Sequence, residues 1–191
     1  MEQRNAYFDG RLRARTEENG KKYIEGYFAV FNQETELWPG WYEQIAPGAF
    51  ANSLRNNDIR CLFNHNSDNV MGRLSAGTLE LREDSYGLWG RVEINEKDSM
   101  AMDVYERVAR GDITGCSFGF MPKDKSKRID DDENWHWTVK EADTSEVSIC
   151  PFPAYPQTEI QAREKDRQEQ KKIKLERQRE VLKEKLEAMK C

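Results

Sequence analysis

Polar and hydrophobic residues alternate over short stretches through most of the first 150 residues, which is the period-two pattern of β-strands. The pattern is clearest around Asn19-Gly20, where RLRART precedes this dipeptide and KKYIEGYFAVF follows it. Asn-Gly between two such stretches is a strong hairpin signal, because both residues adopt the positive φ of a two-residue turn. We therefore expect a β-hairpin on the two sides of this turn.

Further apolar or alternating segments are bounded by Gly, Pro, Asn, Asp and Ser, as strands usually are. They cover residues 41–45, 59–63, 78–82, 88–94, 114–121, 135–139 and 147–150. Many short strands separated by turn residues are typical of a sandwich or barrel. The sequence therefore predicts a mainly β protein with a few helices (α+β), formed as a small closed or partly open β-barrel flanked by helices.

Two helices are expected between these strands. Pro47-Gly48 opens a short one that runs to about residue 56, with the proline in the first turn, where its missing N–H costs nothing. The second is capped by Asp98-Ser99 and ends at Gly111. Its apolar stripe follows helical spacing through Ala101, Val104, Tyr105 and Val108. The charged segment 123–134 is expected to be a solvated hairpin loop.

The last 31 residues differ in composition from everything before them. They contain no Gly or Pro and are dominated by strong helix formers. Leu175, Leu182 and Met189 recur every seven residues, which is too few heptads to indicate a coiled coil. We expect two parts, a folded domain over 1–160 and a charged helical or partly disordered tail over 161–191. A solubilising extension and a docking or self-association helix are equally compatible with this tail.

Charge and cysteine content narrow the class of protein. The net charge is −5, and because residues 163–191 carry eleven Lys or Arg against seven Asp or Glu, the rest of the chain is at −9. An acidic body argues against a nucleic-acid-binding groove. Four scattered cysteines, Cys61, Cys116, Cys150 and Cys191, include no C-x-x-C pair, so neither a zinc site nor a disulfide framework is indicated. No apolar run resembles a signal peptide or a membrane span, and we expect an intracellular protein without membrane contact.

Residues 115–119 read GCSFG and match the G-x-S-x-G pattern of the nucleophile elbow, with Ser117 at its centre. An elbow requires a helix directly after the serine, whereas Ser117 is followed by a strand-like FGFMP. The order of the catalytic residues also differs from that of an α/β-hydrolase, in which the histidine follows the serine along the chain. Here the only histidine after Ser117 is His136, between two tryptophans. The α/β-hydrolase interpretation is therefore disfavoured.

A catalytic triad is defined by geometry and not by sequence order, so a serine within a strand can still be a nucleophile. His65 directly follows the apolar strand 59–63, and an imidazole near its usual pKa can accept a proton at neutral pH. Glu146 begins the apolar strand 147–150, where a carboxylate is costly unless it has a partner. The residues alone indicate a Ser/His hydrolase on a β fold, and no spacing rule links the three.

Several segments together resemble the prohead maturation proteases of tailed bacteriophages, whose fold is similar to that of the herpesvirus assemblins. The matching segments are GYFAVFN with GAFANSL, LFNHNSDNVMGRL around His65, and ITGCSFGFMP followed by EVSICPFPAYP. The resemblance covers residues 20–160 and leaves the tail out. It implies a serine endopeptidase with His65 as general base and Ser117 as nucleophile. The third member is Glu146 or His136, and we prefer Glu146 because it lies within a matching segment.

The resemblance also implies the biological setting. Such enzymes cleave capsid and scaffolding proteins inside the assembling prohead, in the cytoplasm of the bacterial host, and often cleave themselves. No cofactor and no metal are expected, and the herpesvirus relatives suggest a dimer. The alternative is a non-catalytic capsid assembly or scaffolding factor with a vestigial protease domain. Arg73, in the matching MGRL, has two interpretations, a positioning group near the oxyanion site and a simple ion pair. Cys116 is expected on the strand face opposite Ser117, as a core thiol.

Overall fold

The computed structural model describes residues 4–8, 11–151 and 164–188, and it divides the chain into two compact units, Met1–Pro156 and Gln157–Cys191. The two units are considered separately. The predicted boundary between residues 160 and 161 lies outside the described residues and stays a prediction.

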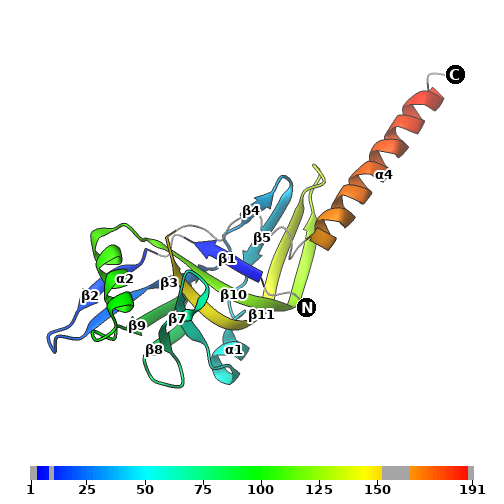
Figure 1. Ribbon diagram of the computed structural model, residues 1–191. Coiled ribbons are helices and arrows are strands. Elements are labelled where there is room, and N and C mark those ends of the chain that lie inside the picture. Colours follow the sequence, from blue (N-terminus) through cyan, green and yellow to red (C-terminus); the bar gives the residue numbers. More distant parts are fainter. Residues whose placement is uncertain (1–3, 9–10, 152–163, 189–191) are drawn as a thin grey trace. The chain divides into compact units, whose positions relative to one another are not determined.

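The first unit contains two β-sheets (Figure 1). The larger sheet has seven strands: β1 (Arg4–Phe8), β4 (Thr35–Trp38), β5 (Trp41–Ile45), β6 (Arg60–Phe63), β7 (Asn66–Arg73), β10 (Gly115–Ile129) and β11 (Trp135–Cys150). The long strand β11 organises this sheet, because β10 pairs along one side of it, antiparallel. On its other side β11 pairs in parallel first with β5 and then with β6.

The smaller sheet has four antiparallel strands, in the order β2, β3, β9, β8. Their bounds are β2 (Arg13–Thr16), β3 (Lys22–Val30), β8 (Leu79–Glu83) and β9 (Gly87–Glu93). The predicted hairpin is confirmed as β2–β3, but its loop covers residues 17–21 and, of Asn19 and Gly20, only Gly20 has a positive φ, of 83°. The inner faces of both sheets share one core, in which the Phe50 and Phe118 rings meet edge to face with their centroids 5.0 Å apart.

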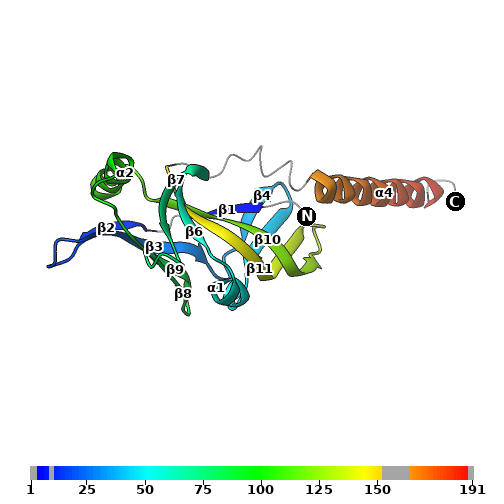
Figure 2. The same ribbon diagram turned by 60° about the horizontal axis from the view of Figure 1, so that its bottom comes forward.

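The mainly β, α+β class is confirmed, but the strands do not close into a barrel. Within the described residues, the larger sheet has three terminal strands, β1, β4 and β7, and the smaller sheet has two, β2 and β8. An isolated bridge between Phe31, just after β3, and Ile45 of β5 links the two sheets. Because the sheets do not close, helices cover part of their faces. Helix α1 (Ala51–Asn56) lies against β11, and helix α2 (Ser99–Arg110) lies against β2 and β3. Figure 2 shows the two sheets and these helices from a second direction.

Helix α2 forms as its sequence predicts. The Asp98 side chain accepts hydrogen bonds from the N–H groups of Met100 and Ala101, and Gly111 ends the helix in a left-handed conformation with φ 84°. The buried residues are the four of the predicted stripe: Ala101, Val104, Tyr105 and Val108. The predicted caps at both ends of this helix and its predicted buried stripe are therefore confirmed.

The charged segment 123–134 is not a loop, so that prediction was wrong. β10 continues through it to Ile129, and the turn to β11 is confined to residues 130–134. The lysines on this arm are accommodated because they lie over tryptophans of the partner strand. The Nζ of Lys125 is 3.9 Å from the Trp137 ring centre and that of Lys127 is 3.7 Å from Trp135. Cation–π contacts of this kind let charged residues occupy a strand.

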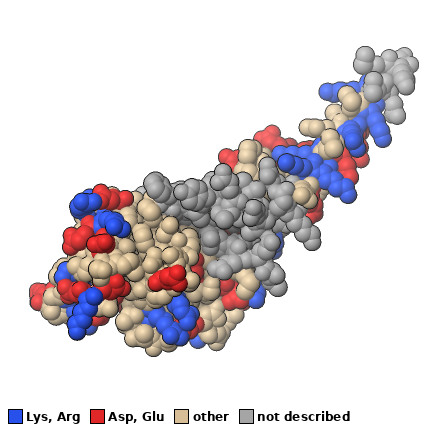
Figure 3. Space-filling model, in the orientation of Figure 1, with Lys and Arg blue, Asp and Glu red and all other residues tan. Residues whose placement is uncertain are grey.

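The second unit contains helix α4 (Glu164–Ala188), which confirms the predicted helical tail. Leu175, Val181 and Leu182 are exposed on it. No helix within the described residues is both long and apolar enough to cross a bilayer. On the face of the first unit seen in Figure 3, Lys and Arg side chains mix with Asp and Glu in small groups. The absence of nucleic-acid binding stays a prediction.

Candidate active site

His65 lies in a two-residue turn between β6 and β7. Phe63 pairs with Asn66, so Asn64 and His65 form the whole loop, with φ values of 55° and 59°. Two-residue hairpins favour positive φ at both positions, and Asn and His are among the residues that tolerate it best. The His65 N–H donates to the Oγ of Ser148 at 3.3 Å. The turn thus fixes the backbone of His65 against β11.

Glu146 and Ser148 are alternate residues of β11 and project from the same face of the sheet. The His65 Nδ1 is 2.7 Å from Glu146 Oε1, and the Ser148 hydroxyl donates to Glu146 Oε2 at 2.6 Å. Glu146 is only 7% exposed. Both carboxylate oxygens therefore have partners, and the carboxylate fixes the orientation of the imidazole.

Ser117 lies on β10 directly opposite Ser148. Opposite residues of an antiparallel pair share a face, with their Cβ atoms about 5 Å apart. Ser117 therefore projects to the same face as Glu146 and Ser148, and its residue is fully buried. The Ser117 Oγ and the His65 Nε2 are both buried without a hydrogen-bond partner among the described residues. The register thus puts Ser117 opposite Ser148, whose side chain contacts both Glu146 and the His65 backbone, while Ser117 Oγ and His65 Nε2 do not hydrogen-bond to each other.

Three cysteines surround this cluster without joining it. Burial, and then the negative charge of Glu146, raises the pKa of the Cys150 thiol to about 12. The same two causes raise the pKa of Cys61. Cys116 is fully buried, and its Sγ donates to the Tyr27 carbonyl at 2.7 Å, as expected for a core thiol. Cys61 and Cys150 stay protonated at neutral pH and are poor nucleophiles.

His136 lies far from this cluster, ten residues before Glu146 on β11. At about 3.3 Å per residue, the strand separates the two by roughly 30 Å. Both His136 nitrogens are engaged, Nδ1 with Glu34 Oε1 at 2.8 Å and Nε2 with Asp130 Oδ2 at 3.0 Å. Burial would lower the His136 pKa, but the hydrogen bonds to the two carboxylates outweigh it and the pKa is raised. Geometry therefore favours Glu146 over His136 as the partner of His65.

Arg73 forms an ion pair with Asp58, and its Nε donates to Asp58 Oδ2 at 2.6 Å. The hydrogen bond from Arg73, joined by bonds from Ser75, holds the pKa of Asp58 well below its usual range. This agrees with the simple ion-pair interpretation of Arg73.

Ser148 was not singled out in the sequence. Its position could have been predicted from the sequence EVSI, because alternate residues of a strand share a face and Ser148 is two residues after Glu146. A small polar residue two positions after a strand-entering carboxylate is a natural second partner for that carboxylate. Nothing in the sequence, however, aligns Ser148 with Ser117 across the hairpin.

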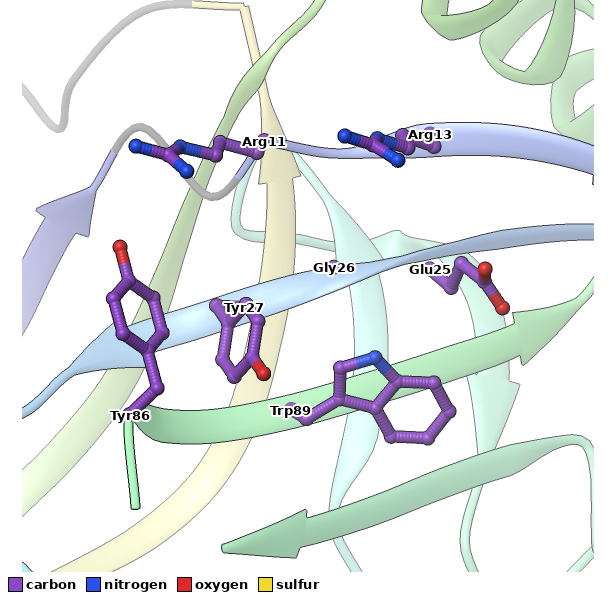
Figure 4. A pocket seen from close by; sticks show the side chains of 7 residues that line it. All are labelled: Arg11, Arg13, Glu25, Gly26, Tyr27, Tyr86 and Trp89. Carbon is purple, nitrogen blue, oxygen red and sulfur yellow. The ribbon is translucent and has the colours of Figure 1, made fainter. Parts of the chain in front are cut away.

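Two pockets of the described residues lie apart from this cluster. One of about 470 Å³ lies on the smaller sheet, where Arg11 and Arg13 lie across from Tyr27, Tyr86 and Trp89 (Figure 4). A second, of about 280 Å³, is lined by residues 70–78 and the start of α2. Neither includes Ser117, His65 or Glu146. No group of three or more His, Cys, Asp or Glu within the described part of the chain could hold a metal ion.

Comparisons with known proteins show the family of this chain. Residues 10–173 match the family described as the caudovirus prohead serine proteases, and the chain belongs to this family. A prohead protease of Enterobacteria phage HK97 is 32% identical over 148 residues, which are 75% of this chain and 61% of that protein. The capsid assembly protease of bacteriophage T4, a solved structure, covers 78% of this chain and 98% of its own, with 11% identity and a TM-score of 0.48.

Proposed function

We propose that this chain is a serine endopeptidase of phage head maturation, with Ser117 as nucleophile, His65 as general base and Glu146 as the orienting carboxylate. One observation carries the proposal: Glu146 holds one nitrogen of His65, while the other nitrogen, and the hydroxyl of Ser117 on the same sheet face as Glu146, are both buried without hydrogen-bond partners among the described residues. Buried polar atoms without partners are rare and often belong to catalytic sites.

The reaction would be acyl transfer. His65 Nε2 takes the proton of the Ser117 hydroxyl as the oxygen attacks the peptide carbonyl, and it then gives that proton to the leaving amine. Water hydrolyses the acyl-enzyme, again with His65 as base. The charge of Glu146 stabilises the imidazolium formed in each step. With Nδ1–H directed at Glu146, Nε2 is left in the unprotonated form that a base needs.

Ser148 would act as a positioning residue. Its hydroxyl donates to Glu146 and its oxygen accepts the backbone N–H of His65, so one side chain ties the carboxylate to the turn. Because the turn is a two-residue loop, a fixed backbone also limits the directions open to the imidazole. The arrangement supports a base that is already oriented before substrate binds.

The substrates proposed are the major capsid protein and the scaffolding protein inside the prohead, in the host cytoplasm. This rests on membership of the family and on the named relatives. We further propose that the enzyme cleaves its own chain during maturation, and that α4 serves as a docking or self-association helix. The exposed Leu175 and Leu182 support the second point, because residues seven apart lie on the same side of a helix and can form a shared apolar stripe.

The test is co-expression of the chain with its capsid protein, followed by mass spectrometry of both proteins. Ser117→Ala should lower processing by several powers of ten, as removal of a nucleophile commonly does. Ser126→Ala, farther along β10, is the matched control and should process normally. If Ser117→Ala processes at the normal rate, the catalytic proposal is wrong and a scaffolding role takes its place.

A further inference from the structure

The strand that carries Ser117 has a neighbour on each side. β11 lies on one side of β10, and β1 pairs antiparallel with the other, from Arg4 opposite Phe120 to Phe8 opposite Cys116. In this register Tyr7 is directly opposite Ser117. β1 is the edge strand of its sheet, as Figure 1 shows. The edge of β10 next to the nucleophile is therefore occupied by the protein itself.

Distance decides where an extended substrate can add to this sheet. Around the site the strands run β1, β10, β11, β6 and β7, so the two edges are β1 and β7. Adjacent strands are about 4.8 Å apart, which puts a peptide added outside β1 about 10 Å from β10 and one added outside β7 about 19 Å from it. Attack requires a carbonyl about 3 Å from the hydroxyl oxygen. Among the positions where an extended peptide can pair with this sheet as a further strand, the one next to β10, which β1 holds, is therefore the nearest to the nucleophile.

The burial of Ser117 supports the same conclusion. Its side chain is fully buried, so no carbonyl can reach its oxygen while the chain keeps this arrangement. Some covering segment must move. Of the two strands beside Ser117, β11 carries Glu146 and Ser148 of the site, whereas β1 is a terminal strand of the sheet. β1 also lies before residues 10–173, the part of the chain that matches the protease family.

β1 is held weakly enough to be displaced from β10. It is five residues long and pairs with β10 along one side only, so few ladder hydrogen bonds hold it. An extended peptide that took its place would regain the same main-chain bonds with β10, as peptides commonly do at sheet edges. The exchange replaces like with like, so the loss of β1 costs little in main-chain hydrogen bonds, and the side-chain contacts of the substrate can favour it.

We propose that β1 is a built-in competitor of the substrate: it occupies the β10 edge that an extended peptide must use, and it is displaced when substrate binds. This inference rests on the proposed protease function, because it takes Ser117 as the nucleophile. The enzyme is then latent in this state, and its apparent affinity for substrate is lowered by the small fraction of molecules in which β1 has left.

A reversible lock tests the proposal in the full chain. Phe8 pairs with the native Cys116, and opposite Cα atoms of an antiparallel pair lie within the range that a disulfide spans. Oxidised Phe8→Cys, with the link confirmed by mass spectrometry, should cleave a peptide from a mapped capsid cleavage site about tenfold more slowly or worse, because the competent fraction falls. Reduction should restore the rate. Phe8→Ser, treated with the same oxidant, is the control.

The outcomes separate the inference from the proposed function. If the linked and reduced forms cleave the peptide at equal rates, β1 does not block the substrate and another segment covers Ser117. If the reduced form shows no activity that depends on Ser117, the protease proposal itself fails. Circular dichroism of the linked form checks that the fold is unchanged.

Two proline variants give an independent test if the link does not form. Along an edge strand, successive N–H groups point alternately toward the partner strand and away from it. Of Ala6→Pro and Tyr7→Pro, one therefore removes a bond to β10 and the other serves as its control. The bond-breaking variant should raise kcat/KM for the same peptide severalfold, because the competent fraction rises. If neither variant raises kcat/KM, the inference is overturned.

Discussion

The two histidines of this chain are both next to carboxylates, but they differ in how many of their ring nitrogens have a carboxylate partner. His136, on β11, has a carboxylate on each ring nitrogen and stacks on Tyr42 with the ring centres 4.8 Å apart. His65, in the turn beside the other end of β11, has one carboxylate and one buried nitrogen that has no hydrogen-bond partner among residues 4–8, 11–151 and 164–188.

The difference shows what separates a structural histidine from a candidate base. Two carboxylates favour the protonated ring of His136, and a protonated imidazole has no lone pair to accept a proton. One carboxylate orients the ring of His65 and leaves its other nitrogen available for a hydroxyl. A carboxylate beside a histidine is therefore no sign of catalysis until the second nitrogen has been examined.

The largest expected effect comes from replacing each histidine with asparagine. Asn tolerates the positive φ of position 65, so His65→Asn removes the base with little backbone strain. It should lower kcat/KM by several powers of ten, as removal of a catalytic base commonly does. His136→Asn should retain activity within about threefold, since position 136 is remote from the site. Equal losses in peptide hydrolysis would end the distinction between the two histidines.

A smaller but still large effect is expected from the carboxylates. Glu146→Gln keeps the shape but loses the charge and can hold the wrong tautomer of His65, so kcat should fall by about 10³ to 10⁴. Asp130→Asn, the matched change beside His136, should leave kcat nearly unchanged. Steady-state kinetics of the two variants would decide. A similar kcat for both would remove Glu146 from the mechanism.

The smallest effect concerns stability and pH. The pKa of His136 is raised above 6.5, its value in the unfolded chain. Its ion pairs therefore contribute fully to the free energy of unfolding below pH 6.5, and this contribution is lost as the pH rises through the pKa of the folded state. The pKa of Asp130 is lowered to about 2, so its own contribution is intact above 3.8. Urea unfolding should therefore show that His136→Asn destabilises more at pH 5 than at pH 9. A deficit that grows toward pH 9 would contradict this.

Much of the framework could be predicted from local patterns. The Asn-Gly hairpin, helix α2 and the Ser117 strand each carry their signal within a few residues. The position of His65 at a strand end was also predictable, because an apolar strand followed by Asn and His resembles a turn. Local chemistry was enough where the structure depends on neighbours in sequence.

Features that depend on distant pairing could not be predicted in this way. The charged arm of β10 resembles a loop until Trp135 and Trp137 lie opposite its lysines. Strand β7 begins with the polar NSDN and becomes a strand because a two-residue turn folds it onto β6. The alignment of Ser117 with Ser148 follows from the hairpin register, which is interrupted by bulges that no local pattern fixes.

The conformation of position 65 has a consequence for engineering. Most L-residues resist a φ of 59°, so a library of substitutions there would be sorted first by how easily each residue accepts the turn and only then by its chemistry. A weak variant could fail for either reason. The measured activity of each variant therefore has to be divided by the fraction of its molecules that are folded before the variants are compared.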